Sequence, residues 1–239
     1  MKLFLFILLF VTSVCFAIDD EERVKSFKNK DAAKKFLELR KLMGTLNAQE
    51  QYERFKKLSE EYPDEIVPKV ILGAQTGDLG QTKPQPEQRR MKAEAVRIIE
   101  PFTHMKFEDS IGYARILVFN EYYYHSGQYR KQFEFGQEIN RLGGRGDYSI
   151  GVGGSQYALE LHRKGKKAEA RKYAEKSRAA WERLDPPESL RKNSFYLVVL
   201  VLTGDRQKAI QIFDETYKNT PEYQEEKCCW KDNVDPRQI

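Results

Sequence analysis

A recurring arrangement of glycine, alanine, an aromatic residue and proline constrains the fold of this chain most strongly. Gly204 follows an apolar segment, Phe195–Leu202, and precedes a second segment that carries Ala209 and Phe213 and ends before Pro221. Glycine can adopt the left-handed conformation that ends a helix, alanine lets two helices approach closely, and proline cannot continue a helix. The arrangement therefore predicts two antiparallel helices packed against each other.

Weaker copies of this arrangement occur upstream at a nearly constant interval. Gly165 precedes Ala170 at the same spacing, lies 39 residues before Gly204, and follows Gly127 by 38 residues. This part of the chain resembles the tetratricopeptide repeat, a helical hairpin with a usual length of about 34 residues. The resemblance is most complete over residues 188–221 and less complete over residues 153–187. It is weakest upstream, because the copy around Gly127 has Gln132 and Gly136 where the alanine and the aromatic residue would lie.

Helical periodicity continues towards the N-terminus. We expect an all-α fold, an α-solenoid of about five antiparallel helical hairpins that form a TPR-like superhelix. The clearest amphipathic helix spans residues 167–184, and Pro186 and Pro187 follow it. The five expected hairpins are 31–43 with 48–62, 64–76 with 86–102, and the three around Gly127, Gly165 and Gly204.

Two glycine-containing segments are predicted to be loops. One spans residues 77–86, and the other spans Gly143–Gly154. Glycine, proline and small polar residues are typical of chain turns. Arg145-Gly146-Asp147, a tripeptide that integrins read in adhesion proteins, lies in the second segment and would be exposed there.

The first 17 residues have the layout of a secretory signal peptide. Lys2 is followed by an unbroken apolar run, Leu3–Val14, and Ala17 precedes an acidic stretch. We expect cleavage after Ala17 and a secreted or periplasmic mature protein with no stable membrane span. The alternatives are a retained anchor and a lipoprotein acylated at Cys15. The expected domains are the signal peptide at 1–17, a flexible segment at 18–30, the repeat domain at 31–221, and a polar tail or short capping helix at 222–239.

Composition and motifs argue against several other classes of function. The chain has 41 basic and 36 acidic residues, a mildly basic balance that does not indicate a nucleic-acid partner. His104, His125 and His162 lie in separate elements without the spacing of a metal motif, and no phosphate-binding loop or nucleophile elbow occurs. We therefore expect no cofactor, no metal and no catalytic residue.

The mature chain has two cysteines, Cys228 and Cys229, which are neighbours. A disulfide between adjacent residues closes a strained ring, so ordinary disulfide geometry is not available within the pair. A strained vicinal disulfide, disulfides to another chain and free thiols all remain open. The second of these would produce a covalent homo-oligomer.

The repeat resemblance implies a function. In tetratricopeptide proteins the first helix of each hairpin lines a concave groove, which receives an extended peptide or a helix of the partner. The resemblance therefore implies an adaptor or scaffold that binds a protein or peptide partner. It places these residues on the groove wall: Leu117, Glu121, Tyr124, His125, Ser155, Leu159, His162, Arg163, Arg191, Ser194 and Val198.

Two functions of other classes stay open at this point. One is an enzyme with a site near the Gly143–Gly154 loop and His162. The other is a structural protein that oligomerises through Cys228 and Cys229.

Overall fold

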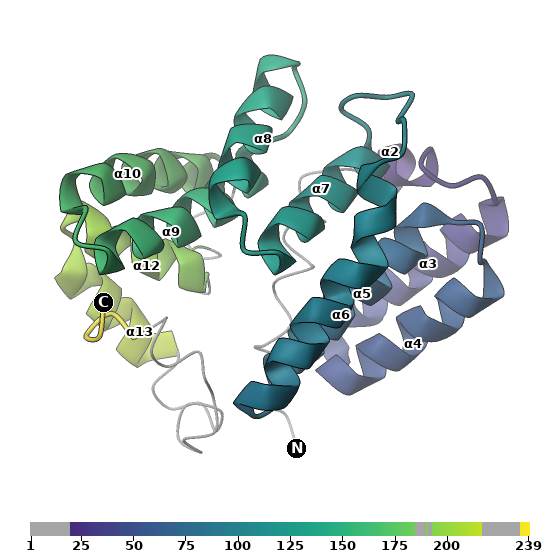
Figure 1. Ribbon diagram of the computed structural model, residues 1–239, viewed down its shortest axis with the longest axis horizontal. Helices are drawn as coiled ribbons and strands as arrows, with labels where there is room; N and C mark the ends of the chain where they lie inside the picture. Colours follow the sequence, from purple (N-terminus) through teal and green to yellow (C-terminus); the bar gives the residue numbers. More distant parts are fainter. Residues whose placement is uncertain (1–19, 185–189, 191–192, 217–234) are drawn as a thin grey trace. The chain divides into compact units, whose positions relative to one another are not determined.

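The computed structural model describes residues 20–184, 190, 193–216 and 235–239. All regular structure in these residues is helical, which confirms the predicted all-α class (Figure 1). The helices pack as neighbouring antiparallel pairs, an arrangement consistent with a solenoid. The chain divides into two compact units, unit 1 up to Gly127 and unit 2 from Gln128.

Unit 1 is built around a central apolar helix. Its elements are α2 (Asp20–Val24), α3 (Lys30–Leu42), the short 3-10 helix η1 (Met43–Thr45), α4 (Ala48–Glu61), α5 (Ile66–Gly80), α6 (Gln85–Thr103) and α7 (Tyr113–His125). Helix α5 packs against α4, α6 and α7. Phe36 of α3 lies 6.4 Å from both the Phe55 ring and the Tyr113 ring, and these three side chains are almost fully buried.

Local capping fixes where the first helices of unit 1 begin. The Asn29 side chain accepts hydrogen bonds from the first N–H groups of α3. Asn47 and Glu50 form a reciprocal capping box at the start of α4. Such side chains satisfy backbone donors that have no partner inside the helix. The predicted bounds of these two helices are confirmed to within a residue.

Unit 2 is built around α9. Its described helices are α8 (Tyr129–Arg141), α9 (Asp147–Arg163), α10 (Lys167–Leu184), α12 (Ser194–Thr203) and α13 (Arg206–Thr216). Helix α9 packs against α8, α10 and α12. Trp181 of α10 is buried, stacks on Phe195 at 6.3 Å, and meets the edge of Tyr148 at 5.7 Å. The observed bounds of α10 are the predicted ones.

The three glycines of the repeat frame have the conformation that the sequence predicts. Gly127, Gly165 and Gly204 have φ values of 73°, 78° and 105°. These are left-handed values, which cost residues with a Cβ atom free energy. The α9–α10 and α12–α13 pairs on either side of Gly165 and Gly204 pack as predicted.

The predicted hairpin around Gly127 spans the division between the two units. Within unit 1, helix α7 packs on α5 and α6, and within unit 2, helix α8 packs on α9. Gly136 explains part of this pairing, because a Cβ there would lie 2.6 Å from the Gly146 carbonyl oxygen. Gly136 stands where this copy of the repeat lacks the aromatic residue. At this position α8 approaches the start of α9.

The prediction of a loop over Gly143–Gly154 is wrong for most of its length. Helix α9 begins at Asp147, so the residues from there on are helical. Its glycines permit close helix contact instead of a turn. A Cβ at Gly151 would lie 2.6 Å from the Trp181 indole, and one at Gly153 would lie 2.6 Å from the Phe133 nitrogen. The Asp147 carboxylate accepts hydrogen bonds from Arg183 at 2.7 and 3.0 Å, so it is not free for recognition by a receptor.

The predicted loop at residues 77–86 is similarly shortened. Helix α5 continues through Gly80, and α6 begins at Gln85. Gly77 is buried where the His125 ring crosses α5, and a Cβ there would overlap that ring. Both segments contain glycine because another element lies against the helix.

The described segments on either side of the predicted repeat domain make contacts with residues distant in the sequence. Residues 20–30, part of the segment expected to be flexible, include α2, and Glu65 binds the backbone N–H groups of Lys28 and Asn29. Near the C-terminus, Arg237 forms an ion pair with Asp214 at 2.6 Å. The signal peptide, both cysteines and residues 222–234 lie outside the described residues.

Candidate functional site

The predicted wall residues of unit 1 lie on α7 and are mostly buried. Leu117, Glu121 and His125 are 1%, 6% and 3% exposed, and Tyr124 is half-buried. The Tyr124 and His125 rings meet edge to face at 5.1 Å. In this structure the first three side chains therefore belong to the interior of unit 1.

The predicted wall residues of unit 2 separate into two groups. Ser155, Leu159 and Val198 are buried, whereas His162 and Ser194 are half-buried and Arg163 is exposed. Arg191 lies outside the described residues. The structure thus leaves the end of α9 and the start of α12 as surface.

Ser155 has a structural environment. Its hydroxyl lies 2.8 Å from the Ser177 hydroxyl, and both serines donate to the Gly151 carbonyl oxygen, at 2.5 and 2.6 Å. The Trp181 indole donates to the Ser155 hydroxyl at 3.3 Å. These bonds satisfy polar groups between α9 and α10, so Ser155 joins these two helices.

Glu121 and His125 belong to a buried polar cluster with Asp78 of α5. The spacing of four residues puts Glu121 and His125 on one face of α7, with Nε2 of His125 3.6 Å from Oε2 of Glu121. Asn120 donates to the other Glu121 oxygen at 3.0 Å, and Gln81 donates to Asp78 at 3.2 Å. Nε2 of His125 is buried and has no hydrogen-bond partner.

The environment of this cluster changes the acidity of Asp78. Its pKa is raised from 3.8 to about 7, mainly by burial; His125 lowers this pKa and the Glu121 carboxylate raises it, both to a smaller extent. Raised carboxyl pKa values of this kind are frequent at functional sites and also occur in structural networks.

A second group of side chains, which we name the tyrosine face, lies on α8, α9 and α10. The Tyr173 ring meets Phe133 at 5.1 Å and Tyr157 at 4.8 Å, both edge to face. The Lys176 ammonium lies 5.8 Å from the Phe133 ring centre, and Arg130 interacts electrostatically with both tyrosines. Tyr157 and Tyr173 are half-buried, and Arg130 and Lys176 are exposed.

The tyrosine face was not predicted from the sequence, because neither Tyr157 nor Tyr173 belongs to a recognised binding motif. One feature of the sequence could have indicated this surface. Tyr157, Glu160 and Lys164 are spaced by three and four residues, which puts an aromatic and two charged side chains on one side of α9.

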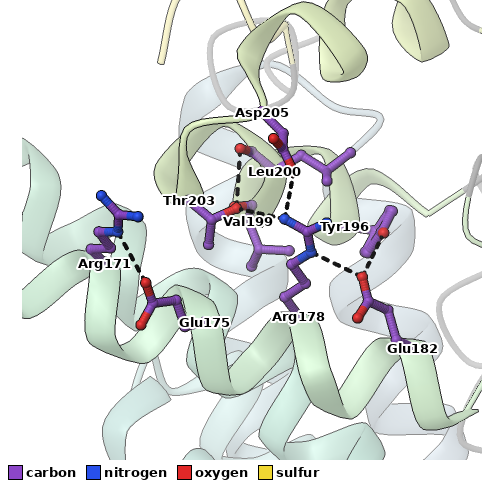
Figure 2. Close-up of polar contacts among 9 residues, drawn as sticks. All are labelled: Arg171, Glu175, Arg178, Glu182, Tyr196, Val199, Leu200, Thr203 and Asp205. Carbon is purple, nitrogen blue, oxygen red and sulfur yellow. Dashed lines mark hydrogen bonds and ion pairs between the residues drawn. The ribbon is translucent and has the colours of Figure 1, made fainter.

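A polar network holds α10 in place beside the last two helices (Figure 2). The Arg178 guanidinium binds Glu182 at 2.9 Å on its own helix and Asp205 at 2.5 Å, just after α12. Tyr196 of α12 donates to the same Glu182 oxygen at 3.0 Å. Because each charged group of this network has an ion partner, we assign it a structural role.

The described residues contain no cluster of three or more histidine, cysteine, aspartate or glutamate side chains that could hold a metal ion. Within the same residues, no helix combines the length and the apolar character needed to cross a bilayer. The glycine-rich loop on which an enzyme site near His162 was based is largely helix α9.

Comparison with known proteins finds no family model, no curated protein and no solved structure that matches the chain. The tetratricopeptide resemblance accordingly remains an interpretation of the sequence.

Proposed function

We propose that this protein is a helical scaffold that binds a partner protein or peptide outside the cytoplasm and catalyses no reaction itself. The observation that supports this function is the tyrosine face. Tyrosine and arginine are enriched among the residues that dominate protein–protein binding energy, because they offer a large contact area together with hydrogen-bonding groups.

The tyrosine face has further properties of a binding surface. Its rings are held against one another by edge-to-face contacts, so a partner would restrict few rotatable bonds on binding. The ion pair between Arg130 and Glu134 puts opposite charges beside the rings. Such a border would orient a partner and add specificity.

The site proposed here lies beside the wall implied by the repeat resemblance. It uses the side of α9 that carries Tyr157 in place of the buried Ser155 and Leu159.

Crosslinking in cells followed by mass spectrometry tests the proposal. The test variant combines Tyr157→Ala with Arg130→Ala, and the matched control combines Tyr52→Ala with Arg54→Ala on α4. Both variants remove one half-buried tyrosine and one exposed arginine. We expect the unchanged protein and the control to capture the same discrete partner, and the test variant to lose it.

Purified components then give the affinity. A loss of at least tenfold in the test variant, with unchanged helical content, would support the assignment. Equal capture by all three proteins, or capture of no discrete partner, would refute it.

A further inference from the structure

The segment from Lys25 to Lys41 concentrates positive charge on unit 1. It contains seven basic and two acidic residues, so its net charge is +5, equal to that of the whole chain. Five of its lysines are exposed and form what we name the lysine face: Lys25, Lys28, Lys30, Lys34 and Lys41.

Among the residues that the structure describes, none of these five lysines forms an ion pair with a carboxylate. Asp31 and Glu61 pair with Lys35, and Asp20 pairs with Arg40. Glu38, the other acidic residue of the segment, lies four residues after Lys34 and three before Lys41 on α3. On α10, Arg171 and Arg178 have glutamate partners one turn away (Figure 2).

The backbone that carries the lysine face is fixed. The Glu65 carboxylate accepts hydrogen bonds from the backbone nitrogens of Lys28 and Asn29, at 3.2 and 2.6 Å. The Ala114 N–H donates to the Ser26 hydroxyl at 3.2 Å, and the Phe27 ring lies 5.2 Å from Phe36. The turn between α2 and α3 is thereby held to α5, α7 and the core.

Helix geometry then gathers three of the lysines on one side. Lys30, Lys34 and Lys41 are separated by four and seven residues, which places them within about 40° of one another around the axis of α3. Leu42, next along the chain, is 42% exposed. Successive residues of a helix are about 100° apart around its axis, so Leu42 lies to one side of this row of lysines.

We propose that the lysine face binds the surface of a membrane that contains anionic lipids. A cluster of exposed positive charge attracts a negatively charged surface, and lysine is a compact point charge without the bidentate geometry by which arginine recognises one defined carboxylate. Rows of lysines suit a surface with many interchangeable phosphate groups, and an exposed leucine can enter its outer apolar layer.

Sedimentation with lipid vesicles tests this inference, using the purified protein as its expression host processes it. Vesicles of equal parts phosphatidylglycerol and phosphatidylcholine are compared with vesicles of phosphatidylcholine alone. The test variant is Lys30→Gln, Lys34→Gln and Lys41→Gln. The matched control is Lys164→Gln, Lys166→Gln and Lys167→Gln, which removes the same charge from exposed positions of unit 2.

Each lysine near an anionic surface contributes roughly fivefold in affinity. We therefore expect the test variant to bind the anionic vesicles about 100-fold more weakly than the unchanged protein at low salt, and the control to bind nearly as well. Binding should also fall steeply as salt screens the charges. All substituted lysines are exposed, so circular dichroism should give equal helical content.

Three results would overturn the inference: equal binding by the two triple variants, equal binding to both kinds of vesicle, or binding to polyglutamate or DNA without binding to anionic vesicles. The last result would assign the face to a different polyanion. The vesicle assay contains no protein partner, so its outcome is independent of the scaffold function proposed for unit 2.

Discussion

Replacing Asp78 with asparagine should change how the stability of unit 1 depends on pH. The folded protein raises the pKa of Asp78 from 3.8 to about 7, chiefly because the carboxyl group is buried. Below about pH 4 this carboxyl is protonated in both the folded and the unfolded chain, so its ionisation costs nothing. As pH rises towards 7, the unfolded chain releases the proton first, and the folded state loses stability.

The magnitude follows from the difference between the two pKa values. A pKa raised from 3.8 to about 7 corresponds to about 4 kcal/mol of destabilisation once pH exceeds 7. Asparagine has the same shape, keeps an oxygen for the hydrogen bond from Gln81, and cannot ionise. The variant should therefore match the unchanged protein at pH 4 and gain up to about 4 kcal/mol at pH 8.

Urea denaturation between pH 4 and pH 8.5 measures this difference, with hydrogen exchange over residues 66–80 reporting on unit 1. The control is Asp64→Asn, which removes an exposed carboxyl group. If Asp78→Asn changed stability by the same amount at pH 5 and pH 8, the burial argument would be refuted.

Three other substitutions test the packing and the turns. Gly136→Ala would place a Cβ atom 2.6 Å from the Gly146 oxygen and 2.7 Å from the Ile150 nitrogen. Urea titration should give a loss of at least about 2 kcal/mol in the free energy of unfolding. A loss near zero would mean that α8 separates freely from α9. Gly204→Ala meets no neighbouring atoms, so we expect only the conformational cost at φ 105°, about 1 kcal/mol by thermal melting, unless the turn rearranges. Arg178→Met should cost up to about 1 kcal/mol, and the cost should shrink in 1 M salt; an effect independent of salt would contradict an ionic origin.

Local sequence signals located most helices. Helices α3, α4 and α10 were predicted to within a residue or two, because their apolar periodicity and their capping residues act over one or two turns. The same signals predicted the α9–α10 and α12–α13 pairs but not the whole packing. They do not show that Gly127, a predicted turn, lies at the division between two compact units.

The candidate site was harder to predict for the same reason. A repeat frame assigns one side of each helix to a groove, but residues 195–202 of α12 are buried on all sides, so helical period alone cannot identify an exposed wall there. The pKa of Asp78 was equally hidden. It depends chiefly on burial by the tertiary packing, and to a smaller extent on His125 and Glu121, which are more than 40 residues away in the chain.

The amino-acid sequence by itself determined that this protein is helical and where several turns lie. Gly127, Gly165 and Gly204 end helices because a left-handed residue without a Cβ atom is a local requirement. Only the tertiary structure decided that Gly77, Gly151 and Gly153 lie inside helices, where His125, Trp181 and α8 approach them. The physical reason is that a missing side chain permits both a turn and a close contact, and only the neighbouring element selects between them.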